Sequence, residues 1–373
     1  MRAMRRTART RGARLLLTVG LAAVLTACAR PSTPSQSTPQ RGAASAAPAT
    51  TPPAPALARE ARAGRGEVVV TLFHETHTHG ALLGVDYPPN SPADGRTFAN
   101  YVGVMAQQRR RLEAGSSLFL GNGDDLSDEL ELPRVFGGGA VRTGGRHVLE
   151  AYAAAGMDAD TFGFGELVAL PRQSAQLRDL VSRSRFTWVS ANVREGSRPA
   201  EVLGAEQGAR RFVLKRVAGI RVGITGVVAT GWKAGTSEMA EQLAPTVTVL
   251  DPVKALREVV PQMRAAGAQV VLVLSHLFFE QMEQIAKRVD GVNVILGSHH
   301  GPPTVYLAEP RVIRGTIISK PGHDMAAVGQ LDLVVRRSDA RIMRFGFQRH
   351  PIAAGGPSSA AVKAVLDRYL AAR

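Results

Sequence analysis

Three short apolar runs in this 373-residue chain end on histidine, and they limit the folds that the chain can adopt. The runs are EVVVTLFH (67–74), AQVVLVLSH (268–276) and VNVILGSHH (292–300). Their valine, isoleucine and leucine content is typical of strands buried on both faces. Other segments have helical periodicity and helix end signals. The alternation predicts an α/β fold, with one mixed sheet or two packed mixed β-sheets flanked by helices.

The expected elements follow this alternation along the chain. Asp251 is a predicted N-cap and Pro252 the first helical residue of one helix. Helices are predicted at 96–115, 146–156, 251–267 and 358–372, further strands at 116–122, 186–193, 311–321, 328–337 and 340–350, and a hairpin at 212–228.

The first 66 residues differ in composition from the rest. A basic stretch (1–14) precedes the apolar run LLLTVGLAAVL (15–25), which is too short to cross a bilayer. The following LTAC resembles the lipobox of bacterial lipoproteins, with Cys28, the only cysteine, as the lipidated residue; an ordinary secretory signal is the alternative. We therefore expect a lipoprotein signal peptide (1–27), a disordered Pro/Ala/Ser-rich tether (28–66) and a folded domain (67–373) on an exported, membrane-anchored protein facing the periplasm or the cell exterior.

The net charge of +15 does not indicate a nucleic-acid partner. Eleven arginines and one acid lie in residues 1–66, which leaves the expected domain only mildly basic. The domain has no block of lysine and arginine, and aromatic residues make up 5% of the chain. We expect no nucleic-acid binding, because it depends on concentrated positive charge and stacking side chains.

Polar clusters follow four of the predicted strands. Five of the nine histidines lie in three of these clusters, and a sixth, His74, directly precedes the first cluster. Loops at the carboxyl ends of strands line one crevice in open α/β sheets, so we expect the clusters to converge. Imidazole and carboxylate groups from separate strands bind zinc, iron or manganese. The clusters are Glu75-Thr76-His77-Thr78-His79, Gly123-Asp124-Asp125, Ser275-His276 and His299-His300.

The order of these clusters resembles that in calcineurin-like metallophosphoesterases, specifically the N-terminal catalytic domain of bacterial 5'-nucleotidases. That family has the motifs D-x-H, G-D, G-N-H-E, S-H and G-H-x-H at strand ends. Residues 75–77, 123–124, 163–166, 275–276 and 297–300 fall at these motifs in turn, and the resemblance extends over residues 67–345. It implies a four-layer sandwich of two β-sheets and helices, and hydrolysis of a small phosphorylated substrate such as a nucleotide.

The resemblance also implies the site residues. Asp124 would bridge two divalent metals, with Glu75 and His77 on one metal and His276 and His299 on the other. Asp124, His276 and His299 are then the catalytic residues. A second alignment places His77 at the aspartate and His79 at the histidine of the first motif. His300 is a candidate for the last histidine, which falls on Gly301.

One motif departs from the family pattern, because G-N-H-E is here Gly163-Phe164-Gly165-Glu166. Neither Phe164 nor Gly165 has a side chain that can bind a metal. Two hypotheses follow: a phosphomonoesterase that uses one or two metal ions, and an impaired relative that binds metal or a phosphorylated ligand without turnover. Family 5'-nucleotidases carry a C-terminal domain that holds the nucleoside; we expect this chain to lack it and therefore to have no such basis for a nucleotide preference. We expect Asp125 to be a solvated loop charge and His147 a surface residue.

Overall fold

The computed structural model describes residues 54–58, 61–75, 78–84, 95–126, 145–195, 208–231, 247–298, 307–322 and 325–371. Of residues 168–176 it describes the helix but not the side chains. All of these residues belong to one compact unit, Pro52–Arg373. The predicted signal peptide and Cys28 lie outside the described residues, as do His77, His299 and His300.

The first sheet has seven strands and mixed direction, in the order β1-β15-β14-β2-β3-β4-β5. Strands β2 to β5 run parallel, and β14 runs antiparallel to both β2 and β15. The bounds are β1 Ala56–Leu57, β2 Glu67–His74, β3 Ser117–Leu120, β4 Ala159–Thr161, β5 Thr187–Val189, β14 Ala327–Arg336 and β15 Ile342–Pro351.

The second sheet has six strands in the order β12-β13-β11-β10-β8-β7. Its four central strands are parallel, and β12 and β7 pair antiparallel at the two edges. Strands β6 and β9 form a separate antiparallel pair. The bounds are β6 Val193–Glu195, β7 Val213–Val217, β8 Ile220–Val228, β9 Val247–Val249, β10 Val270–His276, β11 Val294–Ser298, β12 Arg311–Ile313 and β13 Thr316–Ser319.

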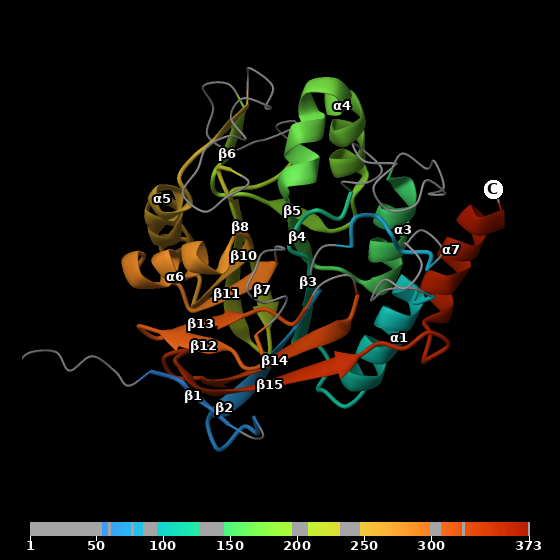
Figure 1. The fold of residues 1–373 in the computed structure, drawn as a ribbon. Helices are drawn as coiled ribbons and strands as arrows, with labels where there is room; N and C mark the ends of the chain where they lie inside the picture. The colour runs from blue at the N-terminus through green and yellow to red at the C-terminus, as the bar shows by residue number, and fades with distance from the viewer. Residues whose placement is uncertain are drawn as a thin grey trace, which may run out of the picture. The chain divides into compact units, whose positions relative to one another are not determined.

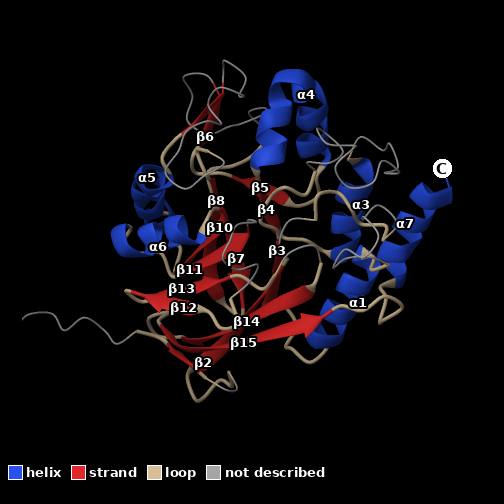
Figure 2. Ribbon diagram, viewed as in Figure 1, coloured by secondary structure: helices blue, strands red, loops and turns tan. Residues whose placement is uncertain are grey.

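The two sheets pack face to face, with helices outside them (Figure 1). Alternate residues of facing strands fill the interior, among them Leu72 and Leu331 from the first sheet and Leu272 and Leu296 from the second. Figure 2 shows the strands between two groups of helices. Helices α5 (Pro252–Ala265) and α6 (Phe279–Arg288) cover the second sheet, and α1 (Phe98–Arg109), α3 (Arg146–Ala155) and α7 (Ala360–Ala371) pack together beside the first. The predicted α/β sandwich is confirmed.

Local signals explain most helix boundaries. Asp251 accepts a hydrogen bond from the Lys254 backbone nitrogen at 2.8 Å, and Pro252 follows as the first helical residue, as predicted. Helix α4 (Phe164–Arg183) was not predicted, because it opens on Phe-Gly and contains Pro171. Helix α6 was not predicted either, because its N-cap residue, Phe278, has no capping side chain; instead the Gln281 side chain accepts a hydrogen bond from the Phe278 backbone nitrogen at 3.1 Å. In the part of the chain that the structure describes, no helix has the length and apolar character needed to cross a bilayer.

The compact unit begins before the expected boundary at Glu67. Strand β1 pairs in parallel with β15, and the Ala58 backbone nitrogen donates to the Phe345 carbonyl at 2.7 Å. Arg344 forms an ion pair with Glu67 at 2.8 Å. The described end of the predicted tether is therefore attached to the domain.

Candidate active site

The candidate site lies where the carboxyl ends of β2, β3 and β10 meet. Asp124 follows β3, and His276 ends β10 in the other sheet. His79 follows β2, and its backbone nitrogen donates to the Asp124 carbonyl at 2.9 Å. Both Asp124 and His276 are buried. Asp124 therefore contacts the loop after β2 in its own sheet and the end of β10 in the other sheet.

Asp124 and His276 form a buried ion pair, with 3.1 Å between Oδ2 and Nε2. The other ring nitrogen of His276, Nδ1, lies 3.2 Å from the Asn122 carbonyl; since a carbonyl can only accept, Nδ1 donates. Burial opposes both charges, but the attraction between them outweighs it. The attraction raises the pKa of His276. The same attraction, together with the charge of His79, holds the pKa of Asp124 below its usual range.

A close contact between the turn at Gly123-Asp124 and the segment Gly163-Phe164-Gly165 fixes the Asp124 backbone. Asp124 has a positive φ of 60°, and its Oδ1 accepts a hydrogen bond from the Gly165 backbone nitrogen at 2.7 Å. A Cβ on Gly163 would lie 2.2 Å from that same Oδ1, so the close approach requires glycine at this position. Glu166 accepts hydrogen bonds from the backbone nitrogens of Asp124, Gly163 and Leu126 at 2.8 to 3.0 Å. The Gly-Phe-Gly-Glu segment therefore orients the aspartate.

Phe164 occupies the position where the resemblance expects a metal-binding asparagine. Its buried ring meets the His276 ring edge-on, with centroids 5.0 Å apart and an angle of 86° between the rings. An aromatic ring packs well there but offers no lone pair to a metal. One metal position of the expected pair has therefore lost a ligand.

Glu75 lies in a separate acidic cluster with Asp125 and Asp160. Neither carboxylate oxygen of Glu75 has a hydrogen-bond partner among the described residues. Burial raises its pKa well above the usual range, and the charges of Asp125 and Asp160 add to the effect. The first alignment assigns Glu75 to the metal, but its close charged neighbours are other carboxyl groups. His79, by contrast, lies close enough to Asp124 for its charge to lower the pKa of that carboxyl group.

Asp125 is fully buried, contrary to the expectation of a solvated charge. Its Oδ1 accepts hydrogen bonds from the Thr78 backbone nitrogen (2.9 Å), the Thr78 hydroxyl (3.0 Å) and the Tyr152 hydroxyl (2.7 Å). Tyr152 comes from α3, which is distant in sequence. Sequence reasoning missed Asp125 because only the tertiary structure brings these donors together.

His147 of α3 anchors the same loop and is likewise buried, not on the surface as expected. Its Nε2 donates to the Gly80 carbonyl at 2.7 Å, one residue after His79. Burial lowers the pKa of His147 to about 4, so its ring is neutral at pH 7. His147 and Tyr152 together hold the loop after β2 against α3.

The structure thus brings His79, Asp124 and His276 together and places Glu75 in the adjacent acidic cluster. Among the described residues, no group of three or more His, Cys, Asp and Glu side chains is arranged to hold a metal ion. A buried carboxylate beside two imidazoles suits zinc, manganese or iron chemically, but a complete coordination shell needs ligands beyond those described. The donor chemistry therefore fits a metal, and the other candidate ligands, His77, His299 and His300, lie outside the described residues.

Comparisons with known proteins show the fold. No family model and no curated sequence matches the chain. A calcineurin-like phosphoesterase from Bacillus subtilis is similar in structure, with a TM-score of 0.61 and 20% identity over 82% of this chain and 98% of that protein. A 5'-nucleotidase precursor from Thermus thermophilus has a TM-score of 0.62 and 23% identity, and the match covers 82% of this chain and 59% of that protein. A sulfate thiohydrolase from the same organism has a TM-score of 0.61 and 18% identity, and the match covers 82% of this chain and 60% of that protein. The chain therefore spans less than two thirds of both Thermus proteins. It has the calcineurin-like phosphoesterase fold that the motif order indicated.

Proposed function

We propose that this protein is a metal-dependent phosphomonoesterase, exported and held at a membrane by a lipid on Cys28. The observation that carries the proposal is the buried Asp124–His276 pair, 3.1 Å apart at the strand ends of a phosphoesterase fold. Burying a carboxylate and an imidazole lowers the stability of the fold unless the two groups are well paired or bind a metal. Metal binding at this pair would use both groups.

The position of His79 favours the second alignment of the first motif. In that alignment His77 takes the place of the aspartate and His79 that of the histidine. His79 is bonded to Asp124 through its backbone, whereas the charged neighbours of Glu75 are Asp125 and Asp160. We therefore propose His77, His79, Asp124 and His276 as ligands, completed by His299 or His300.

We propose one tightly bound metal rather than two, because Phe164 lies against His276. A divalent metal, when bound, supplies positive charge that stabilises the oxygens of the transferred phosphoryl group. Gly165 provides no side chain to assist the leaving group, and its backbone nitrogen is already bonded to Asp124. The loss of one such donor typically slows catalysis by about 10²–10⁴-fold. We expect slow turnover.

Elemental analysis of the full chain, combined with hydrolysis of p-nitrophenyl phosphate and AMP in added manganese or zinc, tests this proposal. We expect about one metal per chain and measurable hydrolysis that Asp124→Asn abolishes. Asp367→Asn is the matched control, because Asp367 is exposed and pairs only with Lys363 among the described residues. Equal hydrolysis in Asp124→Asn and the wild type would refute the assignment of Asp124.

The contact of Phe164 with His276 favours a second candidate function, metal or phosphate-ester binding without turnover. Phe164→Asn distinguishes the two, because it replaces the ring with an amide that can bind metal. We expect the variant to bind a second metal and to hydrolyse faster than the wild type. Metal in the wild type without hydrolysis supports the binding function, and absence of metal from the wild type contradicts both the metal-dependent esterase and metal binding without turnover.

A further inference from the structure

Asn122 contacts both sides of the candidate active site from the turn that carries Asp124, and it is fully buried. Its side-chain nitrogen, Nδ2, donates a hydrogen bond to the Glu75 carbonyl at 2.5 Å. Its backbone carbonyl accepts a hydrogen bond from His276 Nδ1 at 3.2 Å. Glu75 begins the loop after β2, and His276 ends β10 in the other sheet. Asn122 therefore connects two elements that the candidate site needs, although it belongs to none of the motifs that indicated the site.

The glycines on either side of Asn122 leave the contact with the β2 loop to this residue. A Cβ on Gly121 would lie 2.4 Å from Asp160 Oδ1, and a Cβ on Gly123 would lie 2.4 Å from the Gly163 backbone nitrogen. Gly123 also has a positive φ of 83°. Both positions therefore require glycine, and Asn122 supplies the side chain that reaches across to the neighbouring loop.

The Asn122 carbonyl determines which nitrogen of His276 faces Asp124. Because Nδ1 donates to that carbonyl, Nδ1 keeps its proton, and Nε2 is the nitrogen that is left for a metal. Nε2 lies 3.1 Å from Asp124 Oδ2. The hydrogen bond from the Asn122 side chain to Glu75 restrains the same residue, so its loss would loosen the carbonyl as well as the loop after β2.

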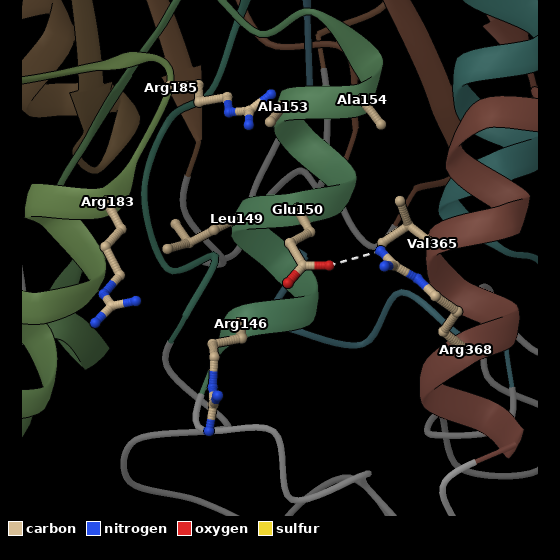
Figure 3. A pocket seen from close by; sticks show the side chains of 9 residues that line it. All are labelled: Arg146, Leu149, Glu150, Ala153, Ala154, Arg183, Arg185, Val365 and Arg368. Atoms are coloured by element: carbon tan, nitrogen blue, oxygen red, sulfur yellow. Dashed lines mark hydrogen bonds and ion pairs between the residues drawn. The ribbon is translucent and has the colours of Figure 1, made fainter.

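Bulk water does not reach these contacts, since both hydrogen bonds of Asn122 are buried. On the far side of the loop after β2, His147 and Tyr152 of α3 contact it. The opposite face of α3 lines a cavity of about 580 Å³, shown in Figure 3, and neither Asn122 nor His276 lines this cavity. A variant that removes the Asn122 side chain therefore cannot replace the lost hydrogen bond with one to bulk water.

We propose that Asn122 is a positioning residue, which holds the loop after β2 and the His276 ring at a fixed separation around Asp124. The proposal rests on the proposed function, because it takes His79 and His276 as metal ligands. An amide suits this position, because Nδ2 is an uncharged donor, whereas a carboxylate would place an acceptor against the Glu75 carbonyl. Removal of a residue that orients metal ligands typically lowers metal affinity by about 10–100-fold.

Proton exchange at His276 Nδ1 in the full chain, freed of metal with EDTA, tests the effect on the ring. NMR of protein with isotope-labelled histidine detects the imidazole N–H groups, and the His276 signal is the one missing from His276→Gln. We expect its proton to exchange with water at least about fivefold faster in Asn122→Ala than in the wild type. Asn293→Ala is the matched control, because Asn293 accepts a hydrogen bond from Val271 at the start of β10, whereas His276 ends that strand. The control should exchange as the wild type does.

Titration with cobalt(II), followed by visible absorption, tests the effect on the metal ligands. We expect Asn122→Ala to bind cobalt about 10–100-fold more weakly than the wild type and with an altered spectrum, and Asn293→Ala to match the wild type. The proposal is overturned by equal proton exchange or equal cobalt affinity in Asn122→Ala and the wild type, or by an equal change in Asn293→Ala. Absence of cobalt from the wild type would refute the proposed metal site, and faster exchange in Asn122→Ala would still support the positioning of His276.

Discussion

Removing the Tyr152 hydroxyl tests whether α3 holds the loop that carries His79. Tyr152 is fully buried, and its hydroxyl donates to Asp125 Oδ1 at 2.7 Å and lies 3.0 Å from the Thr78 hydroxyl. Its ring packs against Phe98, with centroids 4.9 Å apart. Tyr152→Phe keeps the ring and removes only the oxygen and its proton.

The expected loss follows from what remains around Asp125. Its Oδ1 keeps the two Thr78 donors, but its Oδ2 has no hydrogen-bond partner among the described residues. Hydrogen bonds to charged groups contribute about 1.5–3 kcal/mol, and loss of one in a buried site is not replaced by water. We therefore expect the free energy of unfolding to fall by about 2 kcal/mol in urea titrations.

Tyr369→Phe is the matched control for this measurement. The Tyr369 hydroxyl donates to the exposed Glu150 carboxylate at 2.8 Å, and Glu150 keeps its pair with Arg368 after the change. Water can replace the lost donor there, so we expect a loss below about 0.5 kcal/mol. Metal affinity should fall in Tyr152→Phe and not in Tyr369→Phe. Equal losses of stability in the two variants would refute the role given to Tyr152.

Two further predictions concern the same region. Gly163→Ala places a Cβ 2.2 Å from Asp124 Oδ1, so we expect the free energy of unfolding in urea titrations to fall by about 1–3 kcal/mol. Gly64→Ala is the control and should lose little stability, because its Cβ meets only the end of the Glu67 side chain. Similar losses in both variants would contradict the close packing of Gly163 against Asp124. His147 has a folded pKa of about 4, lowered by burial, so it stays neutral while the unfolded chain takes up a proton below about 6.5. The stability from its neutral form is therefore present above about pH 6.5 and lost as pH falls toward 4. His147→Gln should gain about 2 kcal/mol relative to the wild type between pH 7 and 5, and a constant difference across that range would show that His147 has the same pKa in the folded and the unfolded protein.

The fold could be predicted because its signals are local. The runs at 67–74 and 268–276 contain β2 and β10, and Asp251 marks the start of α5. Strand ends then fix which loops meet, so Asp124 and His276 could be paired from sequence alone. These signals need only short windows of sequence and the topology of a parallel sheet.

The placement of Glu75 and the burial of Asp125 could not be predicted. The letters of FHETHTHG fit the first motif in two registers, and the choice depends on contacts with Asp125 and Asp160, which are far along the chain. Asp125 is buried because Thr78 and Tyr152 supply its hydrogen bonds. Such interactions depend on tertiary packing that local patterns do not contain.

The pairing of β1 with β15 has a consequence for the solubility of the domain. The outer strand of a sheet presents unpaired backbone groups to which another chain can add a strand. Here Ala56 and Leu57 lie along β15 opposite Arg344 and Phe345 and cover part of that edge. A fragment that starts at Glu67 would leave this edge of β15 open to association between molecules. A fragment that starts at Pro52 keeps the cover in place and is the better choice for solution work.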